Sequence, residues 1–263
     1  MVTLSIIAVF FYSLGSLQQS VAIGVRQNWG RAGVLLLGLV ACVIHAYLLH
    51  AWIDIVQGQN LDMLNMLSLM CWLLALFVIV LSLFKPVDIL AVGVFPLAAL
   101  SIVFVLMFSR KYIVNTSSDP ITLFHILASV FTSCVLFMAG LVAILLALQE
   151  QLLRYNKFNF LRQYLPSLEL MEGLLFQIIM VGFVLLSVVL VTSFYFYYQI
   201  VFSFDIFPKL LAVCVAWLVF FILLIGRYFW GWRGRKVIYA TLTGAMLLLL
   251  AYFGSRIILK VGH

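Results

Sequence analysis

Four histidines are the residues of this 263-residue chain whose type and placement best suit chemistry. His45 and His125 lie within apolar stretches, His50 lies nearer the end of its stretch, and His263 is the last residue. A polar ring at membrane depth requires a partner or a function. Neutral imidazole is an axial ligand for haem iron, so either ring could hold a haem in an apolar cleft. The alternative is that each ring hydrogen-bonds a neighbouring helix.

The motifs of common enzymes are absent from the sequence. It has no nucleophile elbow, no phosphate-binding loop and no metal-binding helix of paired His and Glu. Only eight residues are acidic, and no apolar stretch carries a pair of carboxylates. We therefore expect a protein that is not an enzyme. A proton-coupled transporter with a buried carboxylate relay is also disfavoured.

Membrane-spanning helices must position these histidines. Hydrophobic residues make up 67% and charged residues 9% of the chain, whereas about a quarter of a soluble protein is charged. Continuous apolar runs of about 20 residues indicate spanning helices and not barrel strands. The eight runs are approximately Val2–Ile23, Gly33–Ile53, Leu64–Phe84, Val87–Phe108, Ile121–Leu148, Leu174–Tyr198, Leu210–Phe229 and Val237–Ile258. The expected fold is an all-α polytopic membrane bundle, with residues 1–263 forming a single domain.

The lysines and arginines predict the orientation of the bundle. Ten of the 15 lie in the joints that follow the first, third, fifth and seventh runs. Because basic joints stay on the cytoplasmic side, both termini are expected on the outer, periplasmic side of a bacterial inner membrane. The net charge of +7 then reflects topology and contact with anionic lipid, and requires no nucleic-acid partner.

Several short motifs, distributed over essentially the whole chain, together match the pattern of one family. They are Gly58–Leu61 followed by Leu64, Asn65 and Ser68, the pair His125 and Ser129, Leu170–Phe176 with Gly182 and Phe183, Gly231–Lys236, and Ala251–Ser255. With His45 included, they resemble the CcsA-like cytochrome c assembly family, and specifically its YpjD-type branch of inner-membrane proteins. Related members hold or translocate haem and present it for attachment to apocytochrome c.

The resemblance implies a haem site with His45 and His125 as metal ligands. It also implies cofactor-binding residues, namely Phe202, Phe204 and Asp205 of an outer joint, together with Arg233 and Arg235. In the family this outer joint is a platform that is rich in Trp and contains an Asp. Here Phe stands in place of Trp. A further family histidine, at the end of the seventh helix, is missing; Arg227, Tyr228 and Phe229 are the residues there.

Two alternatives stay open at this point. The segment Gly231–Arg235 is either a tight turn that anchors the topology or a site where Arg233 and Arg235 bind an anionic group, lipid phosphate or haem propionate. The protein either binds haem and assists cytochrome c assembly, or keeps the fold without haem and docks on another integral membrane protein.

Overall fold

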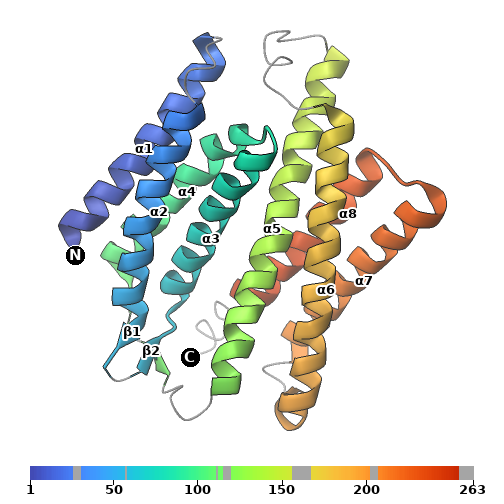
Figure 1. The fold of residues 1–263 in the computed structure, drawn as a ribbon. Helices are drawn as coiled ribbons and strands as arrows, with labels where there is room; N and C mark the ends of the chain where they lie inside the picture. The colour runs from blue at the N-terminus through green and yellow to red at the C-terminus, as the bar shows by residue number, and fades with distance from the viewer. Residues whose placement is uncertain are drawn as a thin grey trace. The chain divides into compact units, whose positions relative to one another are not determined.

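The computed structural model describes residues 1–25, 31–56, 58–110, 112–114, 120–155, 167–201 and 207–254. Within these residues are eight helices long and apolar enough to cross a membrane (Figure 1). The expected all-α, eight-span architecture is therefore confirmed. The placement of both termini on the outer side stays a prediction.

The described residues form two compact units, one up to Pro120 and one from Ile121 onward. Each unit contains four of the helices, and each is considered by itself below. The expectation of a single domain over residues 1–263 stays a prediction.

The first unit packs its four helices around a buried aromatic side chain. They are α1 (Val2–Val25), α2 (Arg31–Ile53), α3 (Met63–Phe84) and α4 (Ala91–Phe108), with a 3₁₀ turn (Asp88–Leu90) before α4. Helix α1 contacts α2 and α4, and α3 contacts the same two helices. Phe95 is fully buried, and its ring fills the space that Gly38 leaves on α2, where a Cβ atom would lie 2.9 Å from Phe95 Cε2.

A small antiparallel sheet closes one end of this unit. Its strands are β1 (Asp54–Ile55), β2 (Gly58–Asn60) and β3 (Ile113–Val114), with β2 in the middle. Gln59 is opposite Asp54 on one side and Val114 on the other. The sheet ties the end of α2 and the segment before α3 to the segment after α4, so these three helices are joined at that end by backbone hydrogen bonds as well as by side-chain packing.

The second unit contains α5 (Pro120–Tyr155), α6 (Leu168–Val201), α7 (Phe207–Trp230), α8 (Arg235–Leu249) and a final π-helical turn (Leu250–Gly254). Glycines allow its helices to approach closely. A Cβ atom at Gly182 on α6 would lie 2.7 Å from Leu136 Cγ on α5, and one at Gly140 on α5 would lie 3.3 Å from Ala245 Cβ on α8. Small residues at such crossings are typical of membrane helices.

Helices α5 and α6 are longer than the apolar runs that predicted them, which were Ile121–Leu148 and Leu174–Tyr198. Helix α5 has 36 residues, a length of about 54 Å at 1.5 Å per residue, whereas a membrane core is about 30 Å thick. The added turns contain Gln149 and Glu150, which are polar but favour helices. Hydropathy therefore predicts where the apolar segment ends, whereas the helix itself continues through polar residues of high helix propensity.

Candidate functional site

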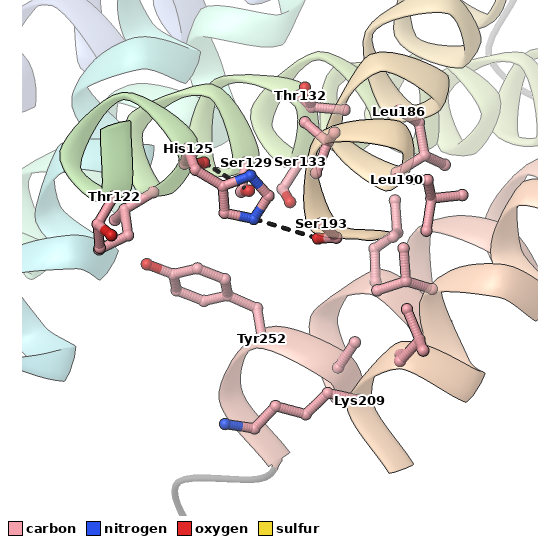
Figure 2. Close-up of a pocket in the computed structure, with 16 residues that line it drawn as sticks. Thr122, His125, Ser129, Thr132, Ser133, Leu186, Leu190, Ser193, Lys209 and Tyr252 are labelled. Atoms are coloured by element: carbon pink, nitrogen blue, oxygen red, sulfur yellow. Dashed lines mark hydrogen bonds between the residues drawn. The ribbon is translucent and has the colours of Figure 1, made fainter. Parts of the chain in front are cut away.

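A cavity of about 420 Å³ lies within the second unit and is lined by 16 residues (Figure 2). They come from α5, α6, α7, α8 and the π-helical turn. Most of the wall is aliphatic, including Leu186 and Val189 from α6, Val213 from α7 and Leu248 from α8. The volume falls in the range of roughly 300–1,000 Å³ that is usual for small-molecule and cofactor sites.

A polar stripe on α5 forms one wall of the cavity. Its members are Thr122, His125, Ser129, Thr132 and Ser133. The first four are spaced by three, four and three residues, which places them on one face of a helix. Because the part of α5 that faces away from the stripe is largely apolar as far as Leu148, the stripe makes this face of the helix the polar side of the cavity.

His125 is held by two hydroxyl groups from α6. Its Nδ1 atom lies 3.0 Å from Thr192 Oγ1, and its Nε2 atom lies 3.3 Å from Ser193 Oγ. The Thr192 hydroxyl donates its proton to the carbonyl oxygen of Val189, 3.0 Å away. A hydroxyl has only one proton, so Thr192 accepts the hydrogen bond from His125 Nδ1. This arrangement of hydrogen bonds assigns the proton of the neutral ring to Nδ1.

The consequence of this tautomer is a lone pair on His125 Nε2. That atom is directed toward Ser193, which also lines the cavity (Figure 2). The separation of 3.3 Å is at the long end for a hydrogen bond, which weakens this contact relative to the one at Nδ1. A ring fixed through one nitrogen, with a lone pair on the other, is the arrangement in which proteins present histidine to a metal.

Thr132 places an unsatisfied hydroxyl in the same cavity. The residue is only 1% exposed, and its Oγ1 atom has no hydrogen-bond partner among the described residues. Buried hydroxyl groups normally have a partner, and an exception requires an explanation. A polar atom of a ligand in the cavity would supply the missing partner. Ser129 differs, because its hydroxyl bonds the His125 carbonyl oxygen at 2.7 Å.

Lys209 and Tyr252 add two polar groups to the cavity from other elements. Lys209 lies in the first turn of α7, and Tyr252 lies in the π-helical turn after α8. Both are shown with His125 around the cavity in Figure 2. The cavity therefore combines one imidazole, one ammonium group and several hydroxyls with a largely aliphatic wall.

His45 lies in the first unit and is fully buried there. Its Nε2 atom is 2.9 Å from Ser68 Oγ, and its Nδ1 atom is 3.4 Å from the Tyr12 hydroxyl. Ser68 in turn lies 3.3 Å from Ser101, whose hydroxyl donates to the Ala98 carbonyl oxygen.

These contacts link all four helices of the first unit, since Tyr12, His45, Ser68 and Ser101 come from α1, α2, α3 and α4. Both ring nitrogens of His45 have partners within this unit. Metal ligation by His45 stays a prediction, and it requires one of these hydrogen bonds to be released.

The joint between α7 and α8 is a tight, internally bonded turn. Gly231 and Gly234 have φ angles of 60° and 61°, which glycine adopts at little cost. Glu172 on α6 accepts a hydrogen bond from the Gly234 backbone N–H at 3.0 Å, and its other oxygen lies 3.7 Å from Arg233 Nε. The structure therefore gives this joint a structural role. Cofactor binding by Arg233 and Arg235, neither of which lines the cavity, stays a prediction.

The remaining predicted site residues, Phe202, Phe204 and Asp205, lie outside the described residues. Sequence reasoning identified His125 and the serine four residues later. It missed Thr132, Thr192 and Lys209. The spacing of hydroxyl residues along α5 would have indicated Thr132, because it repeats at the helical period in an otherwise apolar segment. Thr192 and Lys209 carry no comparable signal, since other helices bring them to His125.

Eight apolar helices, with a histidine-bearing cavity in the second unit, define a polytopic helical membrane protein. A family model described as "Cytochrome C assembly protein" matches residues 60–263. The chain belongs to this family. The chain is also 34% identical over 233 residues to "Inner membrane protein YpjD" of Escherichia coli (strain K12), covering 88% of each chain.

The proteins of the same name from Escherichia coli O6:H1 and O157:H7 show the same identity and coverage. No solved structure matches the chain. The family resemblance inferred from the sequence is therefore confirmed. The expected location is confirmed as well, because the chain is a multi-pass inner-membrane protein.

Proposed function

We propose that this protein binds haem in the cavity of the second unit, where His125 Nε2 would hold the iron, and that it assists cytochrome c assembly. The observation that carries the proposal is the hydrogen bond from His125 Nδ1 to Thr192, at 3.0 Å. It assigns the ring proton to Nδ1, and Nε2 would then bind iron in place of its contact with Ser193. Membership of the cytochrome c assembly family supports haem as the ligand.

The residues of the cavity suit this cofactor. An aliphatic wall covers an apolar macrocycle, and the buried hydroxyl of Thr132 offers a hydrogen bond to a polar substituent. The iron of a bound haem would supply the metal centre that imidazole ligation tunes. The chain's own contributions are to orient the imidazole through Thr192, to exclude water with Leu186, Val189 and Leu248, and to keep the Nε2 lone pair unprotonated.

Other residues implied by the family resemblance stay candidates. His45 is a candidate metal ligand within the first unit, where Ser68 and Tyr12 bind its ring nitrogens. Phe202, Phe204 and Asp205 would form the outer platform, on which haem is presented. Arg233 and Arg235 would bind propionate groups.

The test is the absorption spectrum of the protein purified in mild detergent. Wild-type protein should show a Soret band, either as isolated or after titration with haem, and His125→Ala should lose it. His50→Ala is the matched control, because His50 is exposed and paired with Asp54 at 2.7 Å. This variant should retain the band. A Soret band of full intensity in His125→Ala would contradict the proposal.

A second candidate function is a membrane subunit that lacks haem and docks on another integral protein. The saturated hydrogen bonding of His45 favours it, because that ring needs no cofactor to be satisfied in the bilayer. The same purification distinguishes the two. A colourless protein that takes up no haem, and that copurifies with a membrane partner, would favour docking.

A further inference from the structure

We propose that the Ser193 hydroxyl competes with iron for His125 Nε2, and that this competition keeps haem binding in the cavity reversible. The inference rests on the proposed function, and it adds how that same site is regulated. It is carried by a hydrogen bond between two side chains that line the cavity, His125 on α5 and Ser193 on α6 (Figure 2).

Two consecutive residues of α6 act on the imidazole in opposite ways. Thr192 accepts the hydrogen bond from Nδ1 at 3.0 Å, because its own proton is donated to the Val189 carbonyl oxygen. Ser193 Oγ lies 3.3 Å from Nε2, and a ring nitrogen without a proton can only accept, so the serine is the donor. Thr192 therefore prepares Nε2 as a ligand, whereas Ser193 occupies the lone pair that iron would use.

The lone pair of His125 Nε2 serves one partner at a time. A ring nitrogen that accepts a hydrogen bond along its lone pair cannot direct the same lone pair to a metal. Iron must therefore displace the Ser193 hydroxyl before it binds the imidazole. The free energy of the displaced hydrogen bond is subtracted from the free energy of haem binding, so the serine lowers the affinity.

The displaced hydroxyl has an acceptor within its own helix. The Val189 carbonyl lies four residues before Ser193, and helical serines commonly donate to the carbonyl at that spacing. This oxygen already accepts from Thr192 at 3.0 Å, but a carbonyl has two lone pairs. Rotation of the Ser193 side chain therefore releases Nε2 without stranding a hydroxyl in an aliphatic wall. Ser193 bonds Nε2 before iron binds and the backbone of α6 afterwards.

The contact between Ser193 and His125 is weak enough to be displaced. Its length of 3.3 Å is at the long end for a hydrogen bond, and the net worth of one such bond is small. Ser129, another serine of the cavity wall, differs because its hydroxyl donates to the His125 backbone carbonyl at 2.7 Å. Ser193 therefore lowers the affinity for haem by a modest factor, which suits a protein that takes up haem and passes it on.

The test compares haem with metal-free protoporphyrin, titrated into full-length protein in detergent and followed by absorption. Protoporphyrin has the same macrocycle and acid groups but no iron, so it makes no use of the Nε2 lone pair. We expect Ser193→Ala to strengthen haem binding about two- to tenfold, the worth of one hydrogen bond, and binding of protoporphyrin less than about twofold. Ser193→Thr keeps a hydroxyl and should bind haem as wild-type protein does.

Haem release gives a second readout. Haem should pass from Ser193→Ala to an excess of apomyoglobin about two- to tenfold more slowly than from wild-type protein, since affinity changes within one site appear mainly in the dissociation rate. The control variant is Ser20→Ala, which removes a helical serine of the first unit whose hydroxyl donates to the Ser16 carbonyl oxygen. It should alter neither the titrations nor the transfer.

A measurement on ligand-free protein tests the contact itself. In nitrogen NMR spectra of histidine-labelled protein, loss of the hydrogen bond in Ser193→Ala should move the His125 Nε2 resonance downfield. An unmoved resonance, an unchanged haem affinity, or equal strengthening of both ligands would overturn the role of Ser193 while leaving haem binding intact. If wild-type protein binds no haem, the proposed function fails and the inference fails with it, so the wild-type titration distinguishes the two failures.

Discussion

His125 Nδ1 and Thr192 Oγ1 lie 3.0 Å apart, and the Thr192 proton is directed to the carbonyl oxygen of Val189. The threonine therefore acts as an acceptor toward the imidazole, and it links α5 to α6 at the candidate iron ligand. In metal sites such outer contacts orient the ligand ring and fix its tautomer. Thr192 is a positioning residue in this account, because it acts on the ligand through His125.

Thr192→Val should weaken haem binding about tenfold, since removal of an outer partner of a histidine ligand costs roughly 10–100-fold in metal affinity. The valine keeps the shape of the side chain and removes the hydroxyl, which bonds both His125 and the Val189 carbonyl oxygen. Thr192→Ser should restore binding. Haem titration followed by the Soret band measures both variants. Unchanged affinity in Thr192→Val would show that Thr192 does not fix the imidazole.

Ser68→Ala should destabilise the first unit without affecting the spectrum of bound haem. The substitution removes the partner of His45 Nε2 in a fully buried setting, and an unsatisfied buried donor costs about 1–3 kcal/mol. Thermal unfolding in detergent measures the loss. The control is Ser20→Ala, because among the described residues the bond of the Ser20 hydroxyl is to the carbonyl oxygen of Ser16 on its own helix. A shift of the Soret band in Ser68→Ala would instead place His45 at the haem.

Glu172→Ala should lower the free energy of unfolding by about 1–3 kcal/mol, because the Gly234 N–H loses a charged acceptor. Glu172→Gln keeps an oxygen for that N–H and removes only the ion pair with Arg233, whose side chain is 64% exposed. Exposed pairs are worth about 0–1 kcal/mol. Denaturation of the two variants in parallel provides the comparison. If both substitutions cost the same, the ion pair and not the hydrogen bond holds the joint.

Gly244→Ala should destabilise the contact between α7 and α8. A Cβ atom there would lie 2.8 Å from Phe220 Cε2, and Phe220 is fully buried. Overpacking of this kind costs about 1–3 kcal/mol. Gly93→Ala on α4 meets nothing within 4 Å, so it should be neutral, or stabilising through helix propensity. Melting temperatures of the two variants check the prediction, and equal melting temperatures would contradict it.

The eight spans could be predicted because the membrane imposes one length on every apolar helix. Helix ends were less predictable, since the polar turns of α5 continue to Tyr155 beyond the point where hydropathy falls. The last span, expected to run to Ile258, is helical as far as Gly254, and residues 255–258 lie outside the described residues. Its change from α-helix to a π-helical turn at Leu250, which contains the cavity residue Tyr252, was not predictable from hydropathy.

The candidate site could be predicted only in part. His125 was identifiable because an imidazole in an apolar run is costly without a role. Thr192 is 67 residues away in sequence, and Lys209 was one basic residue among those that set topology. Only the packing of the helices brings Thr192 to His125 and places Lys209 in the lining of the cavity. The partners of His45 were equally hidden, since Tyr12 and Ser68 lie on two other helices.

Chemical rescue of His125→Gly tests the central claim most directly. The variant removes the ring and leaves space for a free imidazole beside the cavity. We predict that His125→Gly binds haem weakly on its own, and that added imidazole restores the wild-type Soret position while leaving wild-type protein unchanged. A wild-type spectrum in His125→Gly without imidazole would show that His125 is not the iron ligand.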